Sequence, residues 1–275
     1  MRSGARTIVV IGATSGLGRQ AAHALAAVGH RLILVGRGPD RATSLARALP
    51  QAHVIRADVA TAGGIDFVAR QVHEVSDTVD TLINNAGVMR PRRETTAEGF
   101  ELDFAVHHLA PYSMASRLLP LLREGDGRVV NVNSEGHRTP MRGGGTVTLD
   151  FADLQSERDY DPFLVYSRTK LTNLMFTYQL HARHPELTMA ALHPGVVRTS
   201  LGREFRTVQV RMVHAFALSA RRGAEPVVRL ATGSVTAGTY YNRFTPVASS
   251  PHSYDTAAAR ALWSATEDLR GPFHS

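Results

Sequence analysis

The sequence of 275 residues contains no cysteine and no long hydrophobic run. Without cysteine, disulfide bonds and thiolate-ligated metal sites are excluded, and a reducing cytoplasm is the natural location. A membrane-spanning helix needs roughly 18 or more consecutive apolar residues, and no segment approaches that length. Residues Met1 to Arg6 offer neither a signal sequence nor an anchor. We therefore expect a cytoplasmic protein with no membrane partner.

Lysine is also scarce, whereas arginine and alanine are abundant, a composition typical of GC-rich bacterial genomes. The net charge is +7 and the pI is about 10.3. Such basic values suggest nucleic acid as a partner. The arginines are scattered, however, and the clusters at 90–93 and 221–222 lie beside predicted loops without interleaved aromatic residues. We expect a solvated basic surface that tolerates a polyanionic ligand, and no nucleic-acid partner.

The order of apolar segments predicts the fold class. With 43% hydrophobic residues, a chain of this length can bury one large core. Strand-like runs alternate with amphipathic segments, which is typical of βαβ units and a parallel sheet. Strands are expected near 7–11, 31–36, 52–57, 80–84, 127–133, 187–193 and 237–241. We predict an α/β protein in which residues 1–275 form a single doubly wound Rossmann-type domain with a seven-stranded parallel sheet.

The first strand-like run leads directly into a glycine-rich loop at 12–18. A helix of small and apolar residues is expected from Leu17 to Val28, closed by Gly29. Glycines let the backbone turn tightly and approach a ligand, and the free N–H groups at a helix start suit a pyrophosphate. The spacing is GxxxGxG, and glycine patterns alone are weak evidence. We expect a dinucleotide cradle that uses Gly12, Thr14, Ser15, Gly16, Leu17 and Gly18.

Tyr166 and Lys170 are four residues apart, so a helix expected at about 164–183 places them on one face. At roughly 6 Å and an effective dielectric near 20, the ammonium would favour the phenolate by about 2–3 kcal/mol and lower the tyrosine pKa by roughly two. The alternative is two solvated side chains. The apolar residues of the same helix fit a core or a subunit interface better than a substrate wall: Leu171, Leu174, Met175 and Tyr178.

Two more motifs follow predicted strands, namely Asn84-Asn85-Ala86-Gly87 and the run that ends in Asn133-Ser134. The other motifs are the glycine loop, Asp58, the Tyr166/Lys170 pair and segment 193–199. In this set and order, the chain resembles the short-chain dehydrogenase/reductase family over nearly its full length. Segments 150–154 and 261–264, with Gly271, resemble the retinol-dehydrogenase-like branch. The resemblance implies the strand order 3-2-1-4-5-6-7 and a homo-oligomer, either a dimer or a tetramer.

The resemblance also implies a nicotinamide dinucleotide and the residues that bind it. Asp58 matches the adenine contact and Thr199 the contact to the nicotinamide carboxamide. The other matching positions are Val59, Asn85, Ala86, Gly87, Tyr166, Lys170, Pro194, Gly195 and Val197. The second strand ends in Gly36-Arg37 and not in an acidic residue, and an arginine can grip a 2′-phosphate. We therefore expect NADP(H) as cofactor; the alternative is an arginine that only faces solvent.

As implied by the resemblance, the reaction is hydride transfer between the nicotinamide and a carbonyl or secondary alcohol. Ser134 would bond the carbonyl oxygen, Tyr166 would exchange the proton, and Lys170 would hold the ribose and lower the phenol pKa. Serine also ends many strands for structural reasons. Two alternatives remain, a non-redox cyclisation or dehydration that retains NADP, and a cofactor-sensing binding protein.

Three features depart from the family pattern, namely Ile11, His107 and the long segment between Ser134 and Tyr166. Ile11 stands where relatives usually have a threonine before the glycine loop. His107 stands where relatives place an asparagine that holds a water leading to the lysine; an imidazole can relay a proton, or it can only support a kinked helix. Residues 135–163 form an insertion that borders the pocket or makes a surface excursion. The substrate lid at about 200–222 mixes apolar residues with arginines, which suits a bulky, mostly apolar substrate or an amphipathic helix on the core. We expect no metal, since His181 and His184 fit incidental surface residues.

Overall fold

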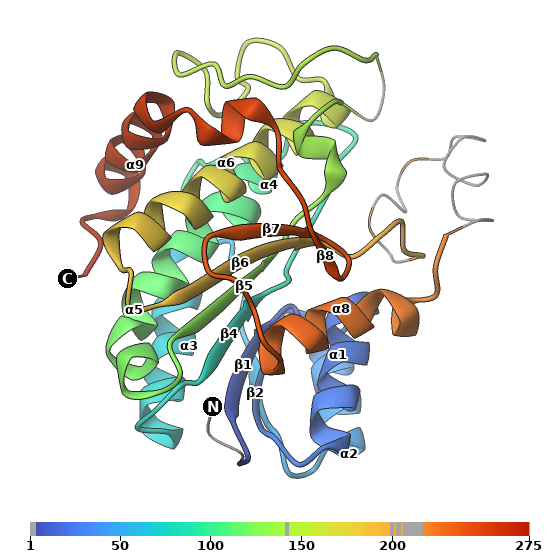
Figure 1. The fold of residues 1–275 in the computed structure, drawn as a ribbon. Coiled ribbons are helices and arrows are strands. Elements are labelled where there is room, and N and C mark those ends of the chain that lie inside the picture. The colour runs from blue at the N-terminus through green and yellow to red at the C-terminus, as the bar shows by residue number, and fades with distance from the viewer. Residues whose placement is uncertain (1–3, 141–142, 199–200, 202–204, 206–216, 275) are drawn as a thin grey trace.

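The computed structural model describes residues 4–140, 143–198, 201, 205 and 217–274. Their backbone forms an eight-stranded sheet in the order β3-β2-β1-β4-β5-β6-β7-β8, in which every neighbouring pair is parallel except β7 and β8 (Figure 1). The strands are β1 Thr7–Ile11, β2 Arg31–Gly36, β3 His53–Arg56, β4 Thr81–Asn84, β5 Arg128–Val132, β6 Thr188–His193, β7 Thr239–Asn242 and β8 Thr245–Pro246. The predicted α/β class and the order of the first seven strands are confirmed.

The strand count of seven is corrected to eight. Strand β8 consists of two exposed residues, one of them Pro246, and pairs antiparallel with the edge of the sheet. It has no apolar pattern, and proline is tolerated only where a strand edge needs no further donor. The sequence therefore carries no periodic signal for it.

Helices lie on both faces of the sheet. They are α1 Gly16–Ala27, α2 Pro39–Ala48, α3 Ala62–Val75, α4 Leu102–Phe104, α5 Ala110–Glu124, α6 Pro162–Arg183, α8 Ala220–Thr232 and α9 Thr256–Arg270, with the short helical turns η1 Ala105–Leu109, η2 Glu135–His137 and η3 Pro251–Tyr254. Helices α1, α2 and α8 cover one face, whereas α3, α5 and α6 cover the other (Figure 1). The alternation of side chains along β1 divides the core accordingly, because Ile8 and Val10 join the first layer while Val9 and Ile11 join the second.

Helix α6 is covered on its outer side by α9, which lies beside it in Figure 1. Leu171 and Met175 pack with Leu262 of α9, and Leu174 packs with Tyr240 of β7. Tyr178 is only partly buried and stacks on Tyr254, with ring centroids 5.2 Å apart. The apolar stripe of α6 therefore belongs to the core of the chain, as predicted.

The end of α1 shows how the glycine after the helix stops it. Gly29 has a φ of +83°, its N–H donates to the Ala26 carbonyl at 3.0 Å, and the N–H of His30 donates to the Leu25 carbonyl at 3.3 Å. These two bonds satisfy carbonyls that the helix leaves open. The predicted helix end is confirmed to within one residue.

Two neighbouring glycines of α3 have opposite environments. A Cβ added to Gly63 would meet nothing within 4 Å, whereas a Cβ added to Gly64 would overlap the carbonyl oxygen of Asp58. We expect Gly64→Ala to lower the free energy of unfolding by about 2–3 kcal/mol because the backbone at Asp58 must move. Gly63→Ala is the matched control and should raise it by up to about 1 kcal/mol. Urea unfolding of both variants measures the difference, and equal stabilities would contradict the packing at Asp58.

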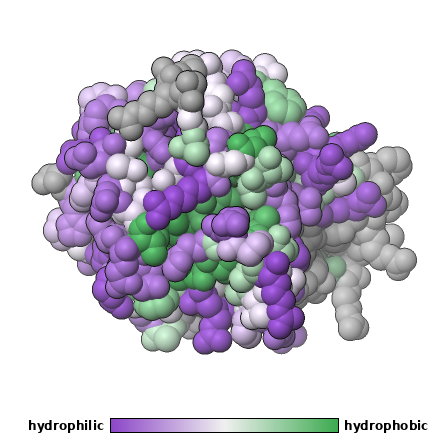
Figure 2. Space-filling view, turned by 90° about the horizontal axis from the view of Figure 1, so that it is seen from below, coloured by the Kyte–Doolittle hydropathy of each residue, from purple (hydrophilic) through white to green (hydrophobic). Residues whose placement is uncertain are grey.

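Figure 2 shows the molecule from below the view of Figure 1, where hydrophobic side chains gather inside a rim of hydrophilic ones. The large hydrophobic side chains that are exposed come from separate parts of the chain: Val28, Phe67, Phe151, Val196, Phe244 and Tyr254. Within the described ranges, no helix combines the length and the apolar character needed to cross a membrane.

Candidate active site

The predicted motifs meet at the edge of the sheet where the parallel strands end. They follow successive strands in space, with Arg37 after β2, Asp58 after β3, Gly12 after β1, Asn85 after β4, Ser134 after β5 and Pro194 after β6. The strand order reverses between β1 and β4, and doubly wound sheets bind ligands at that point. The fold therefore places all of these segments along one edge of the sheet.

The glycine loop approaches the β4 turn so closely that side chains would not fit. Gly12 has a φ of +82°, and a Cβ there would lie 2.7 Å from Ala86 Cα. A Cβ on Gly18 would overlap the Gly12 carbonyl oxygen and the amide of Asn85, whose Nδ2 donates to that oxygen at 3.0 Å. Helix α1 begins directly behind the loop, and the Ser15 side chain does not cap it. Its first N–H groups therefore remain available to an anion.

Beside the loop, Thr14 fits tightly against the end of β2. A Cβ on Gly36 would overlap the Thr14 side chain, so the absence of a side chain at 36 makes room for Thr14. Gly16 has a φ of +51°, and Leu17 is buried in the core layer under α1. The loop thus has the compact shape of a backbone cradle.

Arg37 and Asp58, two residues predicted to bind opposite ends of the adenosine, lie next to each other. The Arg37 guanidinium Nη1 is 3.4 Å from Asp58 Oδ2, and the two side chains are 57% and 42% exposed. An exposed ion pair of this kind contributes little stability, so the arginine can exchange it for a phosphate. Asp58 Oδ1 also accepts the N–H of Ala60 at 3.1 Å, and Val59 is buried beside it.

The segment after β6 lies further along the same edge of the sheet. Gly195 has a φ of +91°, which an L-residue rarely adopts. Val197 pairs with Leu218 in an isolated parallel bridge and packs where a Cβ on Gly223 would stand. Pro194 and these residues lie where the resemblance places them. Thr199 and most of the predicted lid at 200–222 lie outside the described residues.

Ser134, Tyr166 and Lys170 come together behind the glycine loop. A Cβ on Gly136 would lie 3.4 Å from Ser134 Oγ and 3.5 Å from Tyr166 Cε1, so this glycine leaves space between the two side chains. The Lys170 ammonium is 5.6 Å from the centre of the Tyr166 ring and donates to the Val132 carbonyl at 3.2 Å. The three predicted catalytic residues thus form one cluster, in which Tyr166 and Lys170 are buried and Ser134 is half-buried.

The electrostatics of this cluster differ from the sequence prediction. Burial raises the pKa of Tyr166 to about 12, although the Ser134 hydroxyl lowers it and the charge of Asp103 raises it further. Burial likewise lowers the pKa of Lys170 to about 8. The expected lowering of the Tyr166 pKa by Lys170 is therefore wrong for the chain by itself, because desolvation of the phenolate dominates and the ammonium faces the ring.

His107 is held in one tautomer by its neighbours. Its Nε2 accepts the N–H of Val88 at 3.1 Å, so the proton is on Nδ1, which donates to Thr169 Oγ1 at 2.8 Å. The Thr169 hydroxyl in turn donates to the Tyr166 carbonyl at 2.9 Å. Burial keeps the pKa of His107 well below its usual value. Since both nitrogens are engaged, the geometry favours the structural interpretation of His107 over a proton relay.

The position of His107 also explains the irregular helix around it. Residues 105–109 form the π-helical turn η1 between α4 and α5, and the carbonyl of His107 accepts a hydrogen bond from Asn173 Nδ2 at 2.9 Å. Gly87 lies against the ring, since a Cβ there would be 3.5 Å from Nε2. His107 thereby connects the turn after β4 to the helix that carries Tyr166.

Sequence reasoning missed two further residues of this region. His137 is fully buried, accepts the N–H of Ser250 at its Nε2 and donates from Nδ1 to the Ser134 carbonyl at 2.6 Å. Asp103 is also fully buried, one turn before His107. The only sequence signal for Asp103 is a carboxylate between two apolar residues, which an amphipathic helix also shows.

The insertion at 135–163 is attached to the site at several points. Tyr160 donates to the Arg90 carbonyl at 3.1 Å, Arg168 donates to the Thr148 carbonyl at 3.2 Å, and Val147 is buried against α6. Its loops arch over the ends of α4 and α6 (Figure 1). The insertion therefore lies beside the helices of the site and is not a detached surface excursion.

The histidines near the end of α6 have structural surroundings. His184 is buried, contrary to the expected surface position, and its Nδ1 is 3.3 Å from Glu186 Oε1. Across the ranges that the structure describes, no group of three or more histidine or acidic side chains is arranged to hold a metal ion.

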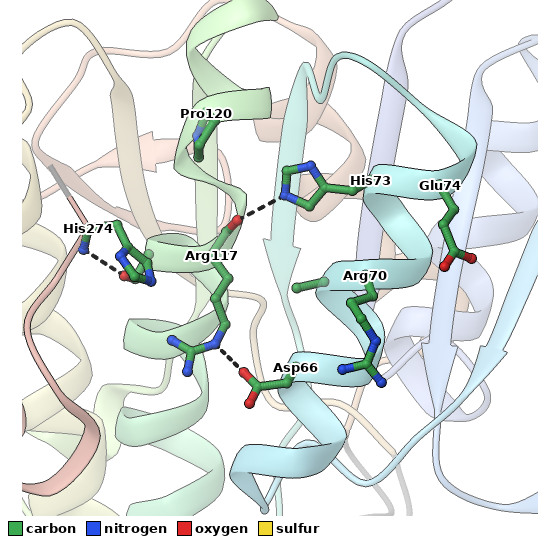
Figure 3. Close-up of a pocket in the computed structure, with 9 residues that line it drawn as sticks. Asp66, Arg70, His73, Glu74, Arg117, Pro120 and His274 are labelled. Atoms are coloured by element: carbon green, nitrogen blue, oxygen red, sulfur yellow. Dashed lines mark hydrogen bonds and ion pairs between the residues drawn. The ribbon is translucent and has the colours of Figure 1, made fainter.

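A shallow groove of about 620 Å³ lies elsewhere, between α3 and α5 (Figure 3). Arg117 and Asp66 form an ion pair across it, and His73 Nε2 contacts the Arg117 carbonyl at 3.2 Å. None of the predicted site residues lines it. The groove has no part in the site at the strand ends.

Comparison with known proteins agrees with this geometry. The family model described as short chain dehydrogenase matches residues 6–146. The chain is 32% identical to human retinol dehydrogenase 13 over 287 residues, covering 97% of this chain and 85% of that protein. It is 33% identical over 274 residues to a protein of Streptomyces sp. (strain C5) named as a candidate daunorubicin C-13 ketoreductase, covering 95% and 91%.

A crystal structure of an uncharacterised protein from Mycobacterium paratuberculosis superposes with a TM-score of 0.79 at 28% identity and covers 98% of this chain and 95% of that one. The fold is a doubly wound α/β domain, and the strand-end site has the location at which such domains bind ligands. The chain belongs to the short-chain dehydrogenase/reductase family, in its retinol-dehydrogenase-like branch. Members of this family are dehydrogenases and reductases that use NAD(P)(H) on small-molecule carbonyls or alcohols.

Proposed function

We propose that the chain is an NADP(H)-dependent oxidoreductase that transfers a hydride between the nicotinamide and a carbonyl or secondary alcohol. The observation that carries this proposal is the cluster of Ser134, Tyr166 and Lys170, in which Ser134 follows β5 at the same edge of the sheet as the glycine loop. The experiment that tests it follows NADPH oxidation by absorbance across a panel of bulky carbonyl compounds. Tight NADPH binding without turnover of any compound would favour a cofactor-sensing protein instead.

Each side chain of the cluster has a separate role in this proposal. Ser134 donates to the carbonyl oxygen, Tyr166 delivers or accepts the proton at that oxygen, and Lys170 binds the ribose. When bound, the nicotinamide supplies or accepts the hydride, and in its oxidised form its positive charge favours the phenolate. His107 and His137 position Tyr166 and Ser134 through the backbone carbonyls described above.

For the dinucleotide itself, we propose that Gly12 and Gly18 shape the backbone that approaches the pyrophosphate, and that Asp58 contacts the adenine. The other proposed contacts are Thr14, Ser15, Gly16, Leu17, Val59, Asn85, Ala86, Gly87, Pro194, Gly195, Val197 and Thr199. The support is the shared position at the strand ends, except for Thr199, which only the resemblance supports.

Arg37 is proposed to select NADP over NAD by binding the 2′-phosphate. Its guanidinium is exposed and its partner Asp58 holds it only weakly, whereas a charge-assisted bond to phosphate is worth about 1.5–3 kcal/mol. We expect Arg37→Ala to raise the KM for NADPH by roughly 10- to 100-fold and to leave the KM for NADH nearly unchanged. Steady-state kinetics with both cofactors measures this ratio, with Arg47→Ala as the control for an exposed arginine of α2. Equal effects on the two cofactors would contradict the assignment.

The proposed substrate is a bulky, mostly apolar molecule. Relatives in the same branch are named for retinol, polyprenol and daunorubicin, which share a large hydrophobic body. In this chain, the ring of Phe163 at the start of α6 lies 5.3 Å from that of Phe205, so aromatic side chains meet near the predicted lid. We further propose that residues 1–275 act as one domain and assemble as a cytoplasmic homo-oligomer.

A further inference from the structure

Asp103 is a buried carboxylate that the proposed reaction does not use. It lies on α4 with no exposed surface, and neither of its carboxyl oxygens has a hydrogen-bond partner among the described residues. Its backbone N–H is bonded to Glu101 Oε1 at 3.0 Å, so the backbone of the turn is fixed. An unpartnered buried carboxylate is costly unless a positive charge is close to it.

Lys170 is the opposite case, a buried cation without an ion-pair partner among the described residues. The residue is 5% exposed, and within the described part of the chain its ammonium donates one hydrogen bond, to the Val132 carbonyl at 3.2 Å. It forms no ion pair with any described acidic residue. Burial lowers the pKa of Lys170, and among the described residues the charge that opposes this lowering is that of Asp103.

The fold brings the two groups to the same interface. Helix α4 contacts α6 (Figure 1), and Phe104, the residue after Asp103, packs with Leu171, the residue after Lys170. The ring of His107, one turn after Asp103, meets the Tyr166 ring edge-on at 5.5 Å. Asp103 and Lys170 therefore flank the contact between these helices.

The neighbouring titratable groups, His107 and Glu101, do not supply the negative charge beside Lys170. His107 has both ring nitrogens engaged with Val88 and Thr169. Glu101 accepts the N–H groups of Asp103 and Phe104 through its two oxygens. Asp103 alone combines full burial, free acceptor oxygens and an electrostatic effect on the lysine.

We propose that Asp103 is the counter-ion of Lys170, a positioning residue that keeps the lysine ammonium charged inside the protein. Several charged and titratable groups face the pair. They are Arg90, Glu94 and Glu101 before α4, His107 on η1, Tyr160 before α6, and Tyr166 on α6. Burial, with the charges of Glu101 and Glu94, holds the pKa of Asp103 well above its usual value, and the charges of Lys170 and Arg90 oppose that rise. Each member of the pair thus favours the charged form of the other, and the two titrate as a unit.

The sequence offers a direct test because Lys170 is the only lysine in the chain. Protein labelled with ¹³C- and ¹⁵N-lysine gives a single side-chain signal, which is followed by NMR from about pH 6 to about pH 11. We expect a midpoint at a pKa of about 8 in the wild type. In Asp103→Asn the midpoint should move down by roughly one pH unit, since loss of the anion disfavours the ammonium.

Matched variants separate this effect from a general disturbance. Asp153→Asn removes an exposed carboxylate and should leave the midpoint unchanged, while Asp103→Glu keeps the charge and should restore it. Where Asp103→Asn does not fold, Asp103→Ser removes the same charge and must show the same direction. An unchanged midpoint in a folded variant that lacks the charge would overturn the proposal.

The importance of this pair for turnover rests on the proposed function. The NMR titration tests the pair itself and does not depend on that function. A chain that reduces no carbonyl compound yet shows the shifted lysine midpoint would refute the oxidoreductase proposal and leave the counter-ion intact. A chain with normal turnover and an unshifted midpoint would do the reverse. The two proposals therefore fail separately.

Discussion

Replacing Tyr166 by phenylalanine is expected to reduce kcat by roughly 10²–10⁴-fold while NADPH binding is retained. The ring of Tyr166 is buried against His107 and Lys170, so phenylalanine fills the same space. What the variant loses is the hydroxyl beside Ser134, the group that we propose exchanges a proton with the substrate oxygen. Steady-state turnover together with NADPH binding, measured by fluorescence titration, separates chemistry from affinity.

Tyr160→Phe is the matched control for this substitution. It also removes a phenol from the region, where the hydroxyl donates to the Arg90 carbonyl at 3.1 Å. Loss of that bond should lower the free energy of unfolding by about 1 kcal/mol and leave kcat within about threefold of wild type. If Tyr166→Phe kept near-normal turnover, Tyr166 would not be the general acid and the mechanism would be wrong.

Adding one methyl group at Gly18 is expected to weaken NADPH binding by roughly 30-fold or more. A Cβ there would overlap the Gly12 carbonyl oxygen and the Asn85 amide, the two groups that join the glycine loop to the turn after β4. The loop must move away, at a cost of about 1–3 kcal/mol, and its backbone no longer matches a pyrophosphate. Isothermal titration calorimetry of Gly18→Ala with NADPH measures the loss.

Gly63→Ala provides the comparison, since it makes the same change in a helix where nothing lies within 4 Å. It should bind NADPH as the wild type does. If Gly18→Ala folds and binds NADPH with unchanged affinity, the dinucleotide does not sit on this loop. Binding of the cofactor at another place would then have to be sought.

The fold follows from the sequence because its signals are local and repeated. Each parallel strand is a short apolar run, and each loop that carries a motif follows it directly, as with Thr7–Ile11 and Gly12. The edge strand β8 escaped detection because two exposed residues have no periodicity. Its pairing depends on the neighbouring strand β7 and not on its own residues.

The sequence predicted that the motifs lie together at the strand ends, but it did not predict the electrostatics there. The four-residue spacing of Tyr166 and Lys170 correctly places both on α6, but spacing does not reveal how far burial shifts each pKa. The tautomer of His107 depends on a backbone N–H that lies 19 residues away in the sequence. Asp103 shows the same limit, since its environment is formed by helices that meet only in the folded chain.

Transfer of deuterium from the cofactor tests the central claim most directly. The chain is incubated with NADPH deuterated at the transferable C4 position, together with retinal and a polycyclic aryl ketone, and the products are analysed by mass spectrometry. We expect an alcohol that carries one deuterium on the former carbonyl carbon, formed with loss of one NADPH, and no such product from Tyr166→Phe. Conversion without NADPH oxidation, or an alcohol without deuterium, would contradict hydride transfer and leave a non-redox reaction.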